Sequence, residues 1–219
     1  MNPITPLLPE NGSKLVVIRF EMLTPKKLTP EEFAAANSET AKYRHLTAPY
    51  CMPNGMPACG VDIASQGDPV VPWAIQFDLP VEEFNRYCSN HPAKGPIQLR
   101  GHGHALPFDS ESLDFVYSSH LLEDYLEWVP VLTEWVRVLR PNGYLVILVP
   151  DKTLWNLAIE KGQTPNCSHT HEGRVGELTE YAERFGMKVI EDRLTEQAPG
   201  DYSILGVFQK IKGGWEYKE

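Results

Sequence analysis

The 219-residue sequence is poor in several features that would indicate an exported or membrane protein. It has four cysteines, Cys51, Cys59, Cys88 and Cys167, and no C-x-x-C pair, so free thiols are expected rather than a disulfide framework. It has no run of eighteen apolar residues. Its first fourteen residues, MNPITPLLPENGSK, lack the basic and apolar regions of a signal peptide. These absences predict a cytoplasmic protein without a membrane partner.

Basic charge is also scarce. The chain has 20 Lys and Arg against 29 Asp and Glu, a formal net charge of −9. Because nucleic-acid binding needs a basic surface, we expect no nucleic-acid partner and a small molecule as substrate. The apolar content of 42% is ordinary for a globular protein. The length predicts one domain over residues 51–219, preceded by an N-terminal extension over residues 1–50.

Short apolar runs alternate with helical patterns, which is typical of an α/β sheet. Thr29, Pro30 and Glu32 form a strong helix start, and the helix is expected to run to about residue 44. Further helices are predicted over 130–139 and 176–185. Seven sheet strands are predicted. The first two end at Asp62 and Asp78, and the others cover 96–99, 113–118, 144–149, 187–191 and 203–211. The last two form an antiparallel pair, 141–143 is a turn, and 14–22 is a strand outside the sheet.

The stretch GVDIASQGDPVVPWAIQFDLP, residues 60–80, holds two apolar runs that each end in an aspartate. Only fifteen residues separate Asp62 from Asp78, so the crossover helix between the strands is expected to be cut to a turn or two. Parallel strands bring their carboxyl ends to one edge, where a small-residue turn and a carboxylate form a nucleoside pocket. The alternatives are a plain turn without a ligand and, for Asp78, a helix-capping role.

Two later segments complete a recognisable order of elements: PFDSESLDFVYSSHLLED, residues 107–124, and VLRPNGYLVILVPD, residues 138–151. With the stretch above, they make the chain resemble the class I S-adenosylmethionine-dependent methyltransferases, and within them the small type 11 domains. The resemblance covers roughly residues 43–211. It implies a Rossmann-like seven-stranded, mostly parallel sheet with an antiparallel last strand pair, S-adenosyl-L-methionine as cofactor, and methyl transfer to a small-molecule acceptor.

The resemblance also implies a set of cofactor contacts. These are Tyr43, Asp62, Ala64, Ser65, Asp78, Leu79, Gly103, His104 and Ser118. The chain departs from the family in two places. Ala64 and Gln66 replace two glycines of the D-x-G-x-G-x-G turn, and His102 replaces an aspartate that accepts from the adenine amino group. A neutral imidazole can still accept one hydrogen bond, and Gly103 keeps its backbone donor.

Two histidines are candidates for handling the acceptor. His120 follows the fourth strand, and His171 lies in CSHTHE, which resembles an H-x-H-E segment of type 11 domains. Histidine is the side chain best matched to proton transfer at neutral pH. The alternatives are a helix N-terminal cluster in which Ser119 caps and His120 is packed, and a capping and lid role for the segment of His171. No metal site is expected, because the ligand types crowd one loop without a second cluster.

Two other functions stay open at this point. The altered glycine turn could bend the methionine arm so that the cofactor becomes a substrate, as in lyases or cyclases that release methylthioadenosine. The same replacements also suit a non-catalytic binding domain. The acceptor atom is open in every case, because the sequence lacks the Asn/Asp-Pro-Pro-aromatic signature of planar amine methylation.

Overall fold

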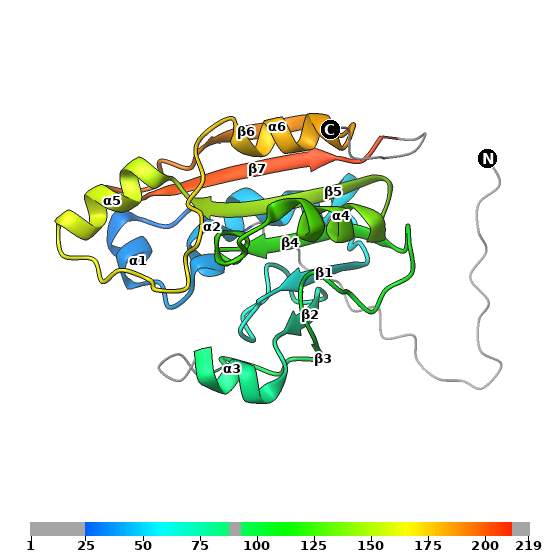
Figure 1. The fold of residues 1–219 in the computed structure, drawn as a ribbon, viewed down its shortest axis with the longest axis horizontal. Helices are drawn as coiled ribbons and strands as arrows, with labels where there is room; N and C mark the ends of the chain where they lie inside the picture. Colours follow the sequence, from blue (N-terminus) through cyan, green and yellow to red (C-terminus); the bar gives the residue numbers. More distant parts are fainter. Residues whose placement is uncertain (1–24, 88–92, 212–219) are drawn as a thin grey trace, which may run out of the picture.

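A seven-stranded sheet organises the chain. The computed structural model describes residues 25–87 and 93–211, so the expected strand over 14–22 and the thiol of Cys88 lie outside the described residues. The strands are β1 Gly60–Ile63, β2 Ile75–Asp78, β3 Leu99–Arg100, β4 Leu113–Ser119, β5 Leu139–Pro150, β6 Lys188–Leu194 and β7 Ser203–Gln209. Their order is β3-β2-β1-β4-β5-β7-β6, which Figure 1 shows from bottom to top.

The strand directions confirm the expected fold class. Strands β1 to β5 run parallel to one another, and β7 runs antiparallel to both β5 and β6. The chain therefore has a Rossmann-like, mostly parallel sheet with an antiparallel last pair.

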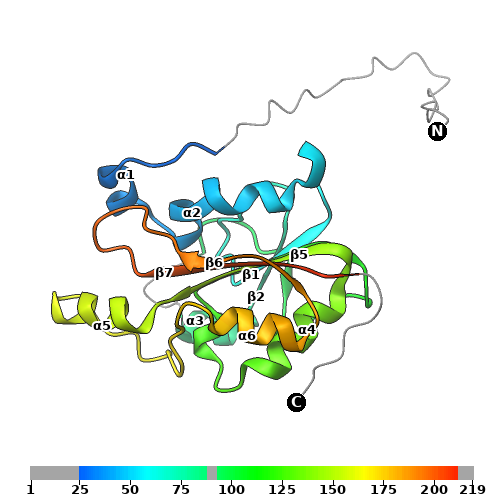
Figure 2. The ribbon, with the colours of Figure 1, turned by 90° about the horizontal axis from the view of Figure 1, so that it is seen from above.

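Helices cover both faces of this sheet. They are α1 Pro30–Ala35, α2 Glu39–Thr47, α3 Val81–Tyr87, α4 Trp128–Val138, α5 Lys152–Glu160 and α6 Glu177–Arg184. Short 3₁₀ turns are η1 Ala48–Cys51, η2 Pro53–Gly55 and η3 Leu122–Asp124. Figure 2 shows α1 and α2 on one face and α4 and α6 on the other. Among the described helices, none is long and apolar enough to cross a membrane.

Apolar periodicity explains both layers. Leu132, Trp135 and Val136 of α4 recur at helical spacing, are buried, and pack in one core cluster with strand residues, as predicted. On the other face, Phe33 of α1 and Tyr43 of α2 belong to a second buried cluster. The N-terminal helices therefore cover the sheet directly, and Tyr43 reaches its carboxyl edge.

The first predicted helix is confirmed at its start and wrong at its end. Thr29 caps α1 in a complete capping box with Glu32. The helix ends at Ala35, because Ala36 is extended with ψ 135°. Ser38 then caps α2 by accepting from the Ala41 N–H at 2.9 Å. Two capped helices therefore replace the single one expected to residue 44.

The β1–β2 crossover contains no helix at all, so it is reduced further than the turn or two of helix that its short length predicted. Residues 64–74 pass through turns, and Val70, Val71 and Ala74 fill the sheet face where a crossover helix would pack. The third strand is shorter than expected, with only Leu99 and Arg100 paired.

Two further expectations need correction in the second half of the chain. The turn predicted at 141–143 lies inside β5, where Asn142 has φ 70° and the pairing with β4 shifts register. Helix α5 was not predicted. Asp151 caps it by accepting from the Leu154 N–H at 3.0 Å, a signal that the apolar strand before it obscured.

Candidate functional site

The carboxyl ends of β1, β2 and β4 meet at one edge of the sheet. Strand β1 lies between β2 and β4, with Ile63 paired to Phe77 on one side and to Ser118 on the other. The crossovers diverge from this point, which is where open α/β sheets bind ligands. The structure therefore brings Asp62, Asp78 and Ser118 to one edge.

The turn after β1 keeps a glycine-like backbone without the glycines. Ala64 has φ 63° and Gln66 has φ 50°, both left-handed, and Gly67 follows with φ 79°. The Ala64 N–H donates to the Phe77 carbonyl at 2.9 Å, and the Gln66 N–H donates to Asp78 Oδ2 at 2.9 Å. These contacts hold a conformation that costs a non-glycine residue about 1–2 kcal/mol.

Replacing Gln66 with glycine should therefore stabilise the protein. Relief of the left-handed strain exceeds the entropy that glycine adds to the unfolded chain, so we expect a gain of about 0.5–1 kcal/mol. Thermal and urea unfolding measure this gain. Gln163→Gly is the matched control, because Gln163 is exposed and is not among the residues with positive φ. A loss of stability in Gln66→Gly would contradict the strain argument.

Asp78 ends β2 with a carboxylate that is 4% exposed. Its Oδ1 accepts from the Leu79 N–H at 2.9 Å, and its Oδ2 accepts from Gln66. Burial raises the pKa of Asp78, which these backbone bonds partly oppose. Each oxygen keeps a second lone pair, so the carboxylate can still accept from two ribose hydroxyls.

Asp62 lies deeper, at 1% exposure, and its Oδ2 accepts from the Val70 N–H at 2.7 Å. Burial raises the pKa of Asp62 well above its usual range, and the carboxylates of Asp68 and Asp78 act in the same direction. Asp62 therefore connects β1 to the residues that replace the crossover helix.

The pKa shift of Asp62 predicts how stability depends on pH. A raised carboxyl pKa means that the folded protein holds its proton more tightly, so stability falls as pH rises from the unfolded value of ~3.9 through the folded pKa. Asp62→Asn keeps an oxygen for Val70 and cannot ionise. Urea unfolding at pH 5 to 8 should show a flatter profile and, at pH 7, a higher free energy of unfolding than that of the natural protein. Asp109→Asn, at an exposed position, should leave the profile unchanged. A parallel pH profile in Asp62→Asn would contradict the expectation.

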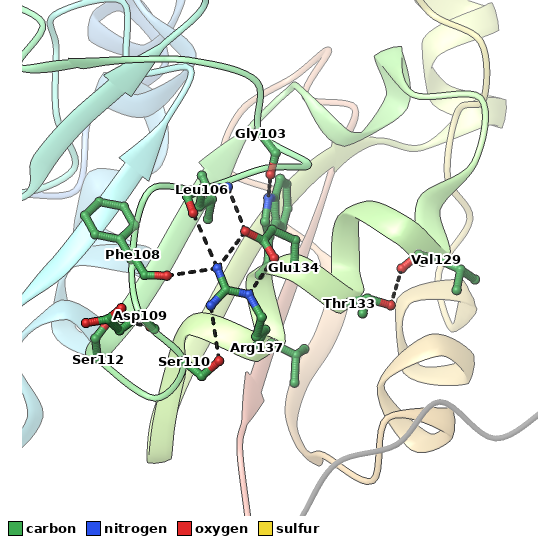
Figure 3. Close-up of polar contacts among 12 residues, drawn as sticks. Gly103, Leu106, Phe108, Asp109, Ser110, Ser112, Val129, Thr133, Glu134 and Arg137 are labelled. Atoms are coloured by element: carbon green, nitrogen blue, oxygen red, sulfur yellow. Dashed lines mark hydrogen bonds and ion pairs between the residues drawn. The ribbon is translucent and has the colours of Figure 1, made fainter.

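The loop that follows β3 carries Gly103 and is held by α4. The Trp135 Nε1–H donates to the Gly103 carbonyl at 2.8 Å. The Leu106 N–H donates to Glu134 Oε1 at 2.7 Å, and Arg137 donates to the Phe108 carbonyl at 2.9 Å (Figure 3). Three side chains of one helix thus fix the backbone that is expected to meet the adenine ring.

Gly103 is also required by space. A Cβ at this position would lie 2.8 Å from Tyr125 Oη, too close for any side chain without a shift. His102 and His104 stack on each other with ring centroids 5.4 Å apart, and His104 is exposed. His102 therefore stands beside the loop where the family's aspartate is expected.

Tyr43 and His120 are brought together from distant parts of the sequence. The Tyr43 hydroxyl is 2.8 Å from both Asp201 Oδ1 and Ser203 Oγ. His120 Nε2 is 3.1 Å from the same Ser203 Oγ, and its Nδ1 is 3.1 Å from Ser119 Oγ. Burial lowers the pKa of His120, so its imidazole is neutral at pH 7. With φ 52°, His120 also carries backbone strain at the sheet edge.

His171 lies in a different set of contacts. Its Nε2 is 2.7 Å from Glu177 Oε1 of α6, and its ring is 4.5 Å from that of Trp128, centroid to centroid. The contacts of His120 lie with α2 and β7 instead. The structure does not join the two histidines in one hydrogen-bond network among the described residues, and their catalytic roles stay predictions.

Several residues near His120 were missed by sequence reasoning. They are Glu123, Trp155, His169, Asp201, Tyr202 and Ser203. Among the described residues, no three His, Cys, Asp or Glu side chains are arranged to hold a metal ion. Glu123 had one visible signal, since it is an acidic residue directly after an apolar pair at a strand end.

The residues at β1 and β2 fit the nucleoside part of S-adenosylmethionine. A buried carboxylate with free lone pairs, a left-handed turn and a glycine required by space lie on neighbouring strand ends. The first suits ribose hydroxyls, and the other two allow close backbone approach. The cofactor roles of the individual residues stay predictions.

Comparison with known proteins supports the same family. A family model described as a methyltransferase domain, of the type 11 class, matches residues 75–147. A curated relative from Mycolicibacterium smegmatis, named "Probable S-adenosylmethionine-dependent methyltransferase", is 33% identical over 90 residues. That alignment covers 41% of this chain and 34% of the relative, so the chain spans about a third of the length of the curated relative it matches.

Solved structures share the fold at low sequence identity. The Burkholderia thailandensis 1,6-didemethyltoxoflavin-N1-methyltransferase, solved with its substrate and S-adenosylhomocysteine, matches with a TM-score of 0.53 and 14% identity, over 84% of this chain and 92% of that one. A methyltransferase solved with the Haloferax volcanii Trm112 activator matches at 0.56 and 16% identity, over 85% and 99%. With the sheet order, these findings confirm the expected resemblance: residues 75–147 match the methyltransferase domain family, and the chain has the fold of S-adenosylmethionine-dependent methyltransferases.

Proposed function

We propose that this protein transfers the methyl group of S-adenosylmethionine to a small-molecule acceptor by in-line displacement. The observation that carries the proposal is the left-handed turn at Ala64 and Gln66, joined by a hydrogen bond to Asp78. The turn keeps the backbone that a cofactor needs, although the family's glycines are replaced. This argues against a methionine arm that is bent by a different turn.

Each part of the edge has a role in this proposal. Asp78 binds the ribose, the loop at Gly103 and His104 meets the adenine, and Ser65 and Ser118 face the methionine arm. Asp62 at the end of β1 and Leu79 after β2 are proposed to complete the cofactor contacts of this pocket. When bound, the cofactor supplies a methyl group on a positively charged sulfur, which is already activated for transfer. The protein has to align the acceptor and exclude water.

Tyr43 and His120 lie on the acceptor side of this edge. Both nitrogens of His120 have hydroxyl partners, so the ring is held in one orientation by Ser119 and Ser203. A neutral imidazole held in this way can orient the acceptor, or take its proton through the hydroxyl of Ser119 or Ser203. His171 is proposed to act from the segment that covers the same edge.

We further propose that the acceptor is a small molecule and that the protein is cytoplasmic, neither of which follows from the family resemblance alone. The net charge of −9 supports a small molecule over a nucleic acid as the acceptor. We also infer that the described part of the N-terminal extension, residues 25–50, covers the domain that starts at residue 51, since Tyr43 of α2 bonds to Ser203 of β7.

Calorimetric titration with S-adenosylmethionine, followed by chromatography of the nucleoside after incubation, tests the proposal. We expect binding with the cofactor intact until an acceptor is added. Release of methylthioadenosine without an acceptor would instead indicate a lyase or cyclase. Absence of binding would indicate a non-catalytic domain and overturn the methyl-transfer proposal.

A further inference from the structure

Glu123 is a buried carboxylate whose two oxygens have no hydrogen-bond partner on any other described residue, although its own backbone N–H lies close enough to lower its pKa. It lies in η3, three residues after His120, and its exposed fraction is 0%. An unpartnered buried carboxylate is costly, and in native proteins it usually has a functional explanation. Its position at the carboxyl edge beside β4 places it on the acceptor side of the proposed site.

A neighbouring imidazole does not supply the missing partner. His169 Nε2 is 3.7 Å from Glu123 Oε1, beyond hydrogen-bond length, and His169 Nδ1 is also buried without a partner. Burial raises the pKa of Glu123 well above its usual range and lowers the pKa of His169. At this distance the two groups do not form a hydrogen-bonded ion pair, and both retain unused hydrogen-bonding capacity.

The surroundings combine aromatic rings with negative charge. The ring of Trp155 lies 5.1 Å from that of His169 and 4.9 Å from that of Tyr202, between centroids. Glu172 Oε1 is 3.9 Å from His169 Nδ1. Aromatic faces next to carboxylates are the features that bind organic cations.

Glu39 adds a further carboxylate near Glu123. The nearby cation, Lys42, does not neutralise Glu123. Lys42 Nζ is 2.8 Å from Glu39 Oε1, so its charge is already paired, while Glu39 Oε2 is buried without a partner. Glu39 also raises the pKa values of Glu123 and Tyr202 as a secondary cause after burial. The negative charge of Glu39 therefore acts on the same region around Glu123 and Tyr202.

The segment 163–172 covers Glu123. The Thr170 N–H donates to the Glu123 carbonyl at 2.8 Å, and Ser168 Oγ donates to Asp124 Oδ1 at 2.7 Å. The residues before them, 161–167, are exposed. A ligand that reaches the Glu123 carboxylate displaces this segment, which carries His169 and His171.

We propose that the acceptor is an organic amine, bound as its ammonium form against Glu123 and beside the rings of Trp155 and Tyr202. The inference rests on the proposed function and narrows its substrate class. An ammonium group supplies a positive charge and up to three N–H donors, which satisfies both free oxygens. An alcohol supplies one donor and no charge, and it leaves one oxygen unpaired.

The same group provides for proton removal. The ammonium loses one proton to the Glu123 carboxylate, which leaves a neutral amine with a free lone pair. The nitrogen then bonds to the methyl carbon while the carbon–sulfur pair goes to sulfur, giving a protonated N-methylamine and S-adenosylhomocysteine. The proton on Glu123 returns to water, directly or through His169.

The test compares two probes that differ in charge at similar size. Protein saturated with S-adenosylhomocysteine is titrated calorimetrically with 2-phenylethylamine and with 2-phenylethanol. We expect the ammonium to bind at least tenfold more tightly. Glu123→Gln should reduce amine affinity at least tenfold while leaving the affinity for the alcohol and for S-adenosylhomocysteine within twofold. Glu160→Gln, at an exposed position at the end of α5, is the matched control and should change amine affinity less than threefold.

The outcomes separate the inference from the function on which it rests. Absence of S-adenosylhomocysteine binding would overturn the proposed function. Normal binding of that nucleoside, with equal affinity for the two probes or with binding of neither, would overturn the amine inference alone. A Glu123→Gln variant that folds and keeps the full preference for the amine would do the same. Trp155→Leu, a second variant, should weaken the amine more than the alcohol and so lower the ratio of their affinities, because leucine offers no aromatic face to the cation.

Discussion

The Asp78→Ala variant will bind S-adenosylmethionine about 5- to 150-fold more weakly than the natural protein. The carboxylate is 4% exposed, and each oxygen has one lone pair left for a ribose hydroxyl. Loss of buried hydrogen bonds costs about 1–3 kcal/mol, which corresponds to this range of affinity. The variant also frees the Gln66 N–H, so the turn that faces the methionine arm loses its anchor. Calorimetric titration with the cofactor measures the change.

Two variants separate ribose binding from turn support. Asp78→Asn keeps an acceptor for Gln66 but removes one of the two acceptors and the charge, so we expect an intermediate loss of affinity. Asp114→Asn changes a carboxylate at the start of β4, where Asp114 pairs with Arg140 at 2.8 Å, and should leave affinity unchanged. Unchanged affinity in Asp78→Ala would rule out the ribose assignment.

Replacing Trp135 with alanine should lower the free energy of unfolding by about 3–5 kcal/mol, the usual range for a buried tryptophan. Trp135 is 0% exposed and lies in the core cluster between α4 and the sheet. Its Nε1–H also holds the Gly103 carbonyl, so the loop expected to meet the adenine loses its support. We therefore expect weaker cofactor binding as well. Urea unfolding and calorimetry measure the two effects.

Trp135→Phe separates packing from the hydrogen bond. It keeps most of the apolar volume and leaves the Gly103 carbonyl without its indole donor, a change worth about 1–3 kcal/mol. We expect a smaller loss of stability than in the alanine variant, with a similar loss of cofactor affinity. Natural affinity in a folded Trp135→Phe variant would show that the bond to Gly103 does not support the site.

Local signals predicted the elements that depend on neighbouring residues. The capping box at Thr29 and the periodicity of Leu132, Trp135 and Val136 are confirmed, because capping and one-sided burial act within a few residues. The helix end at Ala35 was missed. Ser38 starts a second helix there by capping α2. Its Oγ also donates to Asp68 in the β1–β2 crossover. That second contact spans thirty residues.

In the candidate site, too, the residues placed by local signals were predicted, and those that depend on distant contacts were not. Asp62 and Asp78 could be placed together because parallel strands always bring their carboxyl ends to one edge. The contact of Tyr43 with Ser203 joins residues 160 apart, and no local pattern predicts it. Glu123 was missed for the same reason, since its burial depends on a segment more than forty residues later.

The sequence by itself determined the sheet type and the carboxylates at the strand ends, because these follow from alternation and spacing along the chain, and its motifs carried the resemblance to the methyltransferases. Only the tertiary structure decided that Ala64 and Gln66 keep a left-handed turn, that Tyr43 and His120 share Ser203, and that Glu123 is buried without a partner. Strain, burial and hydrogen bonding at these positions depend on what distant segments place against them. That arrangement is set by packing of the whole domain rather than by local propensity.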